Sequence, residues 1–310
     1  MPTAGVWSRV TGLATAWVML GVTLGACASS APLTRPGVIE VVGAESQYAN
    51  VLAQIGGKYV HATAVLSSPF VDPHSFESGT ATARAIADAR LIVQNGASYD
   101  GFMGQLESAT SGSGRRVIVV QRLVGAAVAP FNPHLWYDPS TMPVVASTIE
   151  GDLARILPSH AGYFRANLHR LTASLNAWRA SVTAFRSSHS HVSAAMTEPV
   201  ANYLLRAMGI ATRSPRQFQA DVMNGIDPSP KDIAVQENLL DQHRVDLFCY
   251  NRQVTDSLTA ALLDRARHDH VPVVAVYETL PYGYTYQSWM MAETAAIEAA
   301  VERGTSTEQL

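Results

Sequence analysis

One long run of residues, 160–186, constrains the fold more than any other feature of the sequence. Its large apolar side chains recur at alternating spacings of four and three residues: Phe164, Leu168, Leu171, Leu175, Trp178, Val182 and Phe185. This spacing keeps an apolar stripe on one face of an α-helix. At 1.5 Å per residue the helix is roughly 40 Å long, so we expect it to bridge two lobes. A partner-binding coiled coil is the alternative, but such a stripe in an α/β chain more often packs on its own domain.

Strand-like apolar runs alternate with helical segments on both sides of this helix, which is typical of parallel sheets with crossover helices. Strands are expected at residues 39–42, 62–66, 91–93, 117–120, 192–196, 245–249 and 271–276. Helices are expected at residues 47–55, 81–89, 101–108, 200–208, 230–242, 256–268 and 286–303. We therefore predict an α/β fold with two lobes, each a mostly parallel sheet flanked by helices, joined by one long backbone helix. A chain of 310 residues with 47% apolar residues can fill two cores.

The N-terminus is predicted to be an export signal. Arg9 precedes an uncharged apolar stretch, residues 10–24, that is short for a membrane span. The following Leu24-Gly25-Ala26-Cys27 resembles the lipobox of bacterial lipoproteins, which implies that Cys27 is lipidated and becomes the mature N-terminus. A plain secretory signal with an incidental Cys27 is the alternative.

The remaining chain is expected to divide into four parts. Residues 27–37 are rich in proline and serine and predict a flexible tether. An N-terminal metal-binding lobe is expected at 38–158, the linking helix at 159–188 and a C-terminal metal-binding lobe at 189–310. The signal peptide accounts for residues 1–26.

Charge and cysteine content exclude several kinds of function. The formal net charge is −3 and the sequence has no run of lysine and arginine to neutralise phosphates, so we expect no nucleic-acid partner. After Cys27 the only other cysteine is Cys249, which excludes a disulfide within the folded part and a cysteine-based metal cluster. Its apolar neighbours predict a buried strand.

Two similar segments each place a histidine directly after a proline. They are Asp72-Pro73-His74-Ser75-Phe76-Glu77 and Asn132-Pro133-His134-Leu135-Trp136-Tyr137-Asp138-Pro139. Proline has a fixed φ and restricts the residue before it, so each imidazole is expected on a stiff loop. Such a loop is suited to presenting a metal ligand, although a single His-Pro loop can also be ordinary surface.

Two glutamates follow strands of the predicted second lobe. Glu198 comes just after the strand at 192–196 and Glu278 just after the strand at 271–276. Ligands of open α/β sheets gather at the carboxyl ends of the strands. Glu198 could instead be an acid at a helix N-terminus, and Glu278 a loop acid.

These motifs resemble those of the metal-binding receptor lipoproteins of bacterial zinc/manganese ABC importers, the cluster A-I solute-binding protein family. The resemblance covers residues 38–303 and includes both His-Pro loops, the Asn95-Gly96 turn and the long helix. It implies that the metal ligands are His74, His134, Glu198 and Glu278. The family usually has aspartate at the last position, so Glu278 adds one methylene. Asp100, Asp138 and residues 284–289 are expected to support the site or pack the lobes.

The resemblance implies one divalent transition metal ion as the bound species. Two imidazoles and two carboxylates suit Mn²⁺ or Zn²⁺, and also Fe²⁺. Bidentate carboxylates favour Mn²⁺, whereas monodentate binding gives the tetrahedron that Zn²⁺ prefers. Zinc members often carry a His/Asp/Glu-rich loop, and residues 123–131 lack one, which favours manganese slightly.

The function implied is an extracytoplasmic receptor, expected to be a monomer, that delivers its metal to a membrane permease. Cys27 would anchor it to the outer face of the cytoplasmic membrane. A cell-surface metal-dependent hydrolase and an adhesion lipoprotein are the alternatives. We expect no enzyme, because the sequence has no His-Glu-x-x-His, Gly-x-Ser-x-Gly or Walker-type motif.

Overall fold

The computed structural model describes residues 1–5, 37–70, 76, 79–110, 114–125 and 132–310. The chain divides into two units, Met1–Arg35 and Pro36–Leu310, and every described helix and strand belongs to the second unit. His74 and Cys27 lie outside the described residues.

The first lobe is built on a parallel sheet with the strand order β2-β1-β3-β4. Its strands are β1 (Ile39–Glu45), β2 (Val60–Leu66), β3 (Leu91–Gln94) and β4 (Arg116–Val119). Val41 of β1 stands opposite Ala62 and Leu91. Since side chains alternate along a strand, β1 and β3 each contribute to two cores.

Helices cover both faces of this sheet. Val42, Ala44 and Ile92 pack with α2 (Thr80–Asp88) and α3 (Phe102–Ala109). Val41 and Leu91 face the opposite core, which includes side chains of α1 (Ser46–Gly56) and α5 (Thr141–Ile156). The shorter elements of this lobe are η1 (Gly57–Tyr59), α4 (Val120–Leu123), η3 (Leu135–Tyr137) and η4 (Pro158–His160).

The second lobe repeats the arrangement with the strand order β6-β5-β7-β8, again parallel throughout. Its strands are β5 (Ser193–Met196), β6 (Ala211–Thr212), β7 (Leu247–Asn251) and β8 (Val273–Val276). Its helices are α7 (Asn202–Ala207), α8 (Arg216–Met223), α9 (Pro230–Asp241), α10 (Ser257–His268) and α11 (Tyr286–Arg303).

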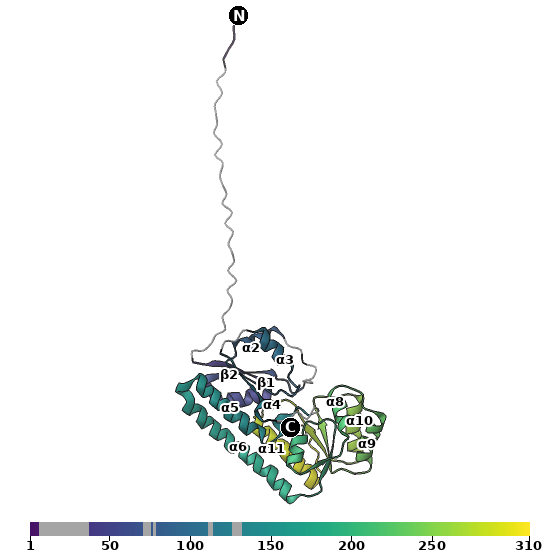
Figure 1. The fold of residues 1–310 in the computed structure, drawn as a ribbon. Coiled ribbons are helices and arrows are strands. Elements are labelled where there is room, and N and C mark those ends of the chain that lie inside the picture. The colour runs from purple at the N-terminus through teal and green to yellow at the C-terminus, as the bar shows by residue number, and fades with distance from the viewer. Residues whose placement is uncertain (6–36, 71–75, 77–78, 111–113, 126–131) are drawn as a thin grey trace. The chain divides into compact units, whose positions relative to one another are not determined.

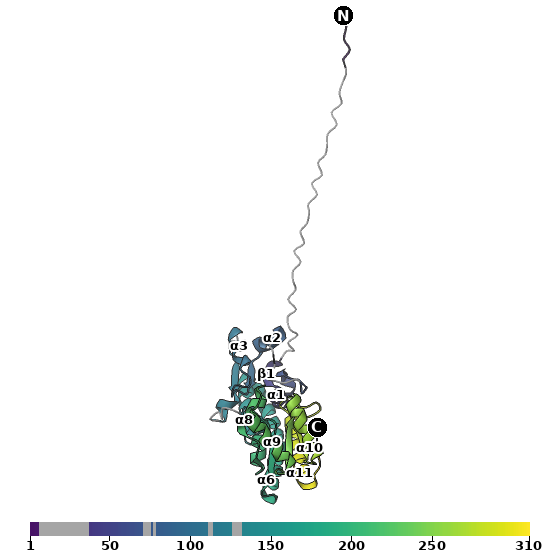
Figure 2. The same cartoon turned by 90° about the vertical axis from the view of Figure 1, so that its right-hand side faces the viewer.

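The two faces of the second sheet have different neighbours. Phe248 and Val273 pack in a core with side chains of α8, α9 and α10, which are grouped together in Figure 2. Leu247 and Cys249 face the core that contains α11. Cys249 is fully buried, as the sequence predicted.

The predicted long helix is α6 (Ala161–Ser188), which runs along both lobes and packs against α5 and α11 (Figure 1). Asn167 near its start donates to the carbonyl of Ile55 in α1 at 2.8 Å. Farther along, Trp178 Nε1 donates to Thr294 Oγ1 of α11 at 2.9 Å. One continuous core extends from Val41 through α6 to β8, so the predicted bridging role is confirmed.

The sequence analysis did not predict α5, α8 or β6. Helix α5 contains Pro143 and several β-branched residues, which lower helix propensity. Pro143 falls in the first turn, where its missing N–H has no helical partner to lose. β6 is only two residues long and is fixed by its pairing with β5, so the local sequence carries little signal for it. Among the described residues, no helix is long and apolar enough to cross a membrane.

Candidate metal site

His134 is held on the loop that leads into η3 and is completely buried. The Oδ1 atom of Asn132 accepts from the backbone N–H of His134 at 3.1 Å and lies 2.9 Å from its Nδ1. Because an amide oxygen only accepts, Nδ1 must carry the hydrogen. The lone pair of the neutral ring is therefore on Nε2, which is the form in which histidine binds a metal.

Glu278 reaches His134 from the second lobe. It follows β8, is fully buried, and places Oε2 3.2 Å from Nε2 of His134. Asn251 Nδ2 donates to Oε1 at 2.7 Å, and the Tyr99 hydroxyl donates to Oε2 at 2.8 Å. Two ligand atoms of one metal ion, each about 2.1 Å from it, lie roughly 3.0–3.4 Å apart. The separation of these two atoms falls within that range.

The backbone at Glu278 is fixed by contacts within and between the lobes. Gln253 Oε1 accepts from the N–H groups of Glu278 and Thr279, at 2.6 and 3.0 Å. Gln47 of α1 donates to the Glu278 carbonyl at 3.3 Å. The Thr279 hydroxyl donates to the carbonyl of Ser68 at 3.0 Å, close to the His74 segment in sequence. These bonds join the Glu278 segment to the first lobe.

The turn after β3 places Tyr99 in the site. Asn95 and Gly96 donate their backbone N–H groups to the carboxylate of Asp100, at 2.6 and 2.9 Å. Gly96 has φ of +75°, and a Cβ there would lie 3.0 Å from the side chains of Val119 and Gln121, so glycine is favoured at this position. Burial raises the pKa of Tyr99 well above its usual value, and the neighbouring Glu278 raises it further, so Tyr99 remains a donor.

Glu198 follows β5, as the sequence predicted, and is 1% exposed. It is among the carboxylates whose charge raises the pKa of Tyr99. The structure thus brings His134 and Glu278 together, and the charge of Glu198 acts on the pKa of Tyr99, which donates to Glu278. Within the part of the chain that the structure describes, no group of three or more His, Cys, Asp or Glu side chains is arranged to hold a metal ion. His74 lies outside that part.

The expected supporting residues have different roles. Asp100 stabilises the turn after β3, and its burial raises its pKa to about 6. Asp138 instead accepts from Ser140 at the start of α5. Within residues 284–289, Tyr286 donates to the carbonyl of Trp136 at 2.5 Å and so packs the lobes together.

Several side chains that hold the candidate site together were not predicted from the sequence. Asn132 stands two residues before His134. An Asn side chain often accepts a hydrogen bond from the backbone N–H two residues later, so the sequence did carry a local signal for this contact. Asn251 and Gln253 lie at the end of β7, and their approach to Glu278 depends on the pairing of β7 with β8. No local sequence pattern predicts that these two side chains contact the Glu278 segment.

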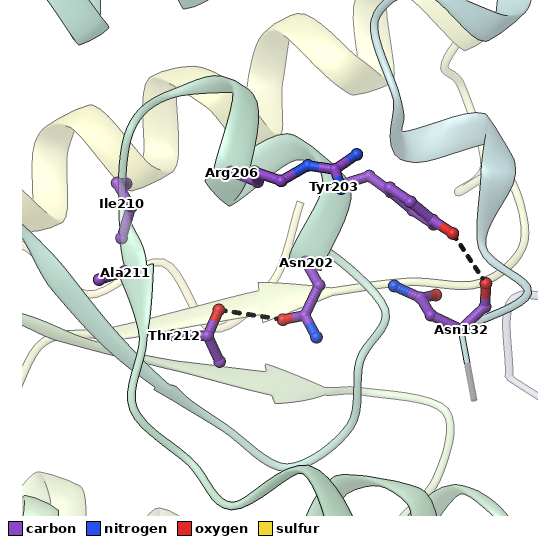
Figure 3. Close-up of a pocket in the computed structure, with 7 residues that line it drawn as sticks. All are labelled: Asn132, Asn202, Tyr203, Arg206, Ile210, Ala211 and Thr212. Carbon is purple, nitrogen blue, oxygen red and sulfur yellow. Dashed lines mark hydrogen bonds between the residues drawn. The ribbon is translucent and has the colours of Figure 1, made fainter. Parts of the chain in front are cut away.

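A pocket of about 430 Å³ lies beside the Asn132 segment. Figure 3 shows Tyr203 extending from α7 to the carbonyl of Asn132, to which its hydroxyl donates at 3.1 Å. The guanidinium of Arg206 lies 5.1 Å from the centre of the Tyr203 ring, a cation–π distance. Helix α7 of the second lobe thereby supports the segment that orients His134.

The fold and the inter-lobe His–Glu pair define a two-lobe α/β binding protein. The solved zinc-binding protein TroA of Treponema pallidum superposes with a TM-score of 0.71 at 19% identity, covering 87% of this chain and 100% of that one. FpvC of Pseudomonas aeruginosa, solved with Mn²⁺, gives a TM-score of 0.70 at 18% identity, covering 86% and 98%. At such identities the likeness shows the shared fold.

The chain belongs to the family described as "Zinc-uptake complex component A periplasmic", whose model matches residues 41–300. This confirms the predicted family, one of metal-binding transport receptors and not of enzymes. The manganese-binding lipoprotein MntA of Bacillus subtilis is 27% identical over 135 residues. That match covers 42% of this chain and 44% of MntA, less than half of either protein.

Proposed function

We propose that this protein captures a divalent transition metal ion, Mn²⁺ or Zn²⁺, between its lobes and delivers it to the permease of an ABC importer. The observation that carries the proposal is the buried pair of His134 and Glu278, one from each lobe, at a separation suited to two ligands of one ion. The hydrogen bond from Nδ1 to Asn132 leaves Nε2 as the ligand atom.

The proposed ligands are His74, His134, Glu198 and Glu278. Two neutral imidazoles and two carboxylates form a neutral site with one divalent ion, which lowers the cost of burying the charge. The names of relatives support both metals, since MntA is described as manganese-binding and TroA as zinc-binding. Fe²⁺ fits the same donors.

The cellular setting is proposed on the same basis. We place the protein at the outer face of the cytoplasmic membrane as a monomer, held by lipid on Cys27 after removal of residues 1–26. Residues 27–37 serve as a tether, 38–158 and 189–310 as the lobes, and 159–188 as the linking helix. The description of the family as periplasmic and of MntA as a lipoprotein supports this arrangement.

Equilibrium dialysis against Mn²⁺ and Zn²⁺ tests the site. Wild type should bind one ion per chain, and His134→Ala should lose at least about a hundredfold in affinity, since it removes a ligand and leaves Glu278 buried. Asn238→Ala, an exposed change on α9, is the matched control. Equal binding by all three proteins would show that the metal site lies elsewhere.

A further inference from the structure

A buried cluster around Glu293 joins the two segments that carry His134 and Glu278. Glu293 lies on α11 and is 0% exposed. Its Oε1 accepts from Trp289 Nε1 at 2.6 Å and lies 2.9 Å from the Tyr137 hydroxyl oxygen. Because Tyr137 belongs to η3, three residues after His134, the cluster connects α11 to the histidine loop.

The Tyr137 hydroxyl also contacts the backbone beside Glu278. It donates to the carbonyl of Tyr277 at 2.7 Å and accepts from the N–H of the same residue at 3.2 Å. Tyr277 directly precedes Glu278 in the chain. One phenol group of the first lobe therefore bonds to both α11 and the end of β8 in the second.

The number of hydrogens decides which of these bonds coexist. A phenol has one hydrogen, but the Tyr277 carbonyl and Glu293 Oε1 both lie at accepting distance from it. An ionised Glu293 competes for that hydrogen, at the expense of the carbonyl. A protonated Glu293 donates to the phenol oxygen instead, so Tyr137 can donate to Tyr277, and every bond is made at once.

The surroundings of Glu293 favour the protonated form. Burial raises the pKa of Glu293 to about 8. The groups coupled to it are Tyr137 of η3, Tyr277 after β8, Cys249 of β7 and Tyr286 of α11 itself. Burial raises the pKa of each of these groups too, so all four are neutral at pH 7.

We propose that Glu293, in its protonated form, is a positioning residue that fixes the His134 loop against the Glu278 segment and so holds the two halves of the metal site at binding distance. This inference rests on the proposed metal-binding function. According to this proposal, α11 influences metal affinity through the positions of the ligand segments, and Glu293 itself does not bind the metal.

The test compares the pH dependence of metal binding in wild type and Glu293→Gln. A glutamine amide donates and accepts at all pH values and so imitates the protonated acid. The dissociation constant for Zn²⁺ is measured by chelator competition at about pH 7 and about pH 9. Zinc hydrolysis and ligand ionisation affect both proteins alike and cancel in the ratio of the two constants.

The ratio of wild-type to variant dissociation constants should be near one at about pH 7. At about pH 9 only about a tenth of Glu293 remains protonated, so wild type should bind up to about tenfold more weakly than the variant. A ratio that stays the same at both pH values contradicts the proposal. If wild type binds neither Zn²⁺ nor Mn²⁺ at about pH 7, the proposed function itself fails, and this is distinct from an unchanged ratio.

A second variant removes the bridge at its centre. Tyr137→Phe lacks the hydroxyl and should bind zinc about tenfold more weakly than wild type at about pH 7, and the difference should shrink at about pH 9, where the bridge of wild type is itself weakened. Tyr250→Phe is the matched control, because Tyr250 is also buried but packs in the core on the other face of the second sheet. A Tyr137→Phe protein that melts at a lower temperature but binds zinc like wild type would reduce the cluster to a structural role and overturn the proposal.

Discussion

Single atoms decide the chemistry of the candidate site, and the position of one hydrogen on His134 matters most. Asn132 binds both the backbone N–H and Nδ1 of that residue, so the ring and its tautomer are set together. Asn95 in turn donates to the carbonyl of Pro133 at 2.8 Å, between these two residues. Amide side chains thus hold the imidazole of His134 in the form that can bind a metal, which would reduce the cost of ordering it on binding.

Removing the amide that orients His134 should weaken binding without removing a ligand. Asn132→Ala removes the hydrogen bonds that fix the orientation and the tautomer of the imidazole, and we expect metal affinity to fall about 10- to 100-fold. Asn238→Ala again serves as the control. Isothermal titration with Mn²⁺ measures the difference. Unchanged affinity in Asn132→Ala would mean that its hydrogen bonds do not select the binding form of the ring.

The sequence indicated the candidate ligands more readily than the side chains that surround them. His134, Glu198 and Glu278 could be proposed from their places after prolines and strands, and all three are buried. Whether they bind metal stays a prediction. The donors to Glu278, Tyr99 and Asn251, come from a turn and a strand far apart in the chain. Only the tertiary fold brings them together, so no local pattern could identify them.

At the scale of secondary structure, α11 is the element that links stability to the site. It begins with a capping box between Thr285 and Ser288, and its buried face includes the acid Glu293. A carboxyl group that is buried in its neutral form is tolerated best at low pH, because the same group is then protonated in the unfolded chain as well. At higher pH the unfolded chain releases the proton and the folded state loses stability.

Stability should therefore depend on pH through Glu293. Its folded pKa of about 8 exceeds the unfolded value, so unfolding becomes easier as pH rises from about 5 to about 8. Burial raises the pKa of Glu45 and of Asp100 as well, and both act in the same direction. The free energy of unfolding of metal-free protein is measured with urea at several pH values. Plotted against pH, it should fall less steeply for Glu293→Gln than for wild type, by at most about 1.4 kcal/mol per pH unit. Identical slopes would show that Glu293 is ionised in the folded state.

The long helix should contribute to stability without affecting the chemistry of the site. Leu175 is fully buried on the shared face of α6. We expect Leu175→Ala to lower the free energy of unfolding by about 2–5 kcal/mol while metal affinity stays near that of wild type. Arg179→Ala, an exposed change on the same helix, should have little effect. If Leu175→Ala loses affinity as strongly as stability, α6 also sets the geometry of the site.

Sequence patterns predicted the elements with strong periodicity and missed the others. The stripe of α6 and the apolar strands were recognised because burial demands a regular spacing. In α5, several β-branched residues lower the helix propensity locally, and packing of Val145 and Ile149 in the core outweighs that preference. The weak elements α8 and β6 depend in the same way on tertiary contacts.

On the scale of the whole molecule, the two lobes share one core through α6 and α11. A continuous helix along both lobes favours small tilts over a wide hinge opening. A metal ion that takes ligands from both lobes would stabilise the joined form by mass action, by about 2.7 kcal/mol at a hundredfold excess over the dissociation constant. Thermal stability therefore reports directly on the proposed site.

The most direct measurement is a competitive thermal-shift titration of the purified protein with Mn²⁺, Zn²⁺ and Fe²⁺, with Glu198→Ala alongside and bound metal counted by elemental analysis. We predict one ion per chain and a saturable rise in melting temperature that is lost in Glu198→Ala. The order of the shifts would rank the metals. If no metal produced a saturable rise in wild type, the account of an inter-lobe metal receptor would be wrong.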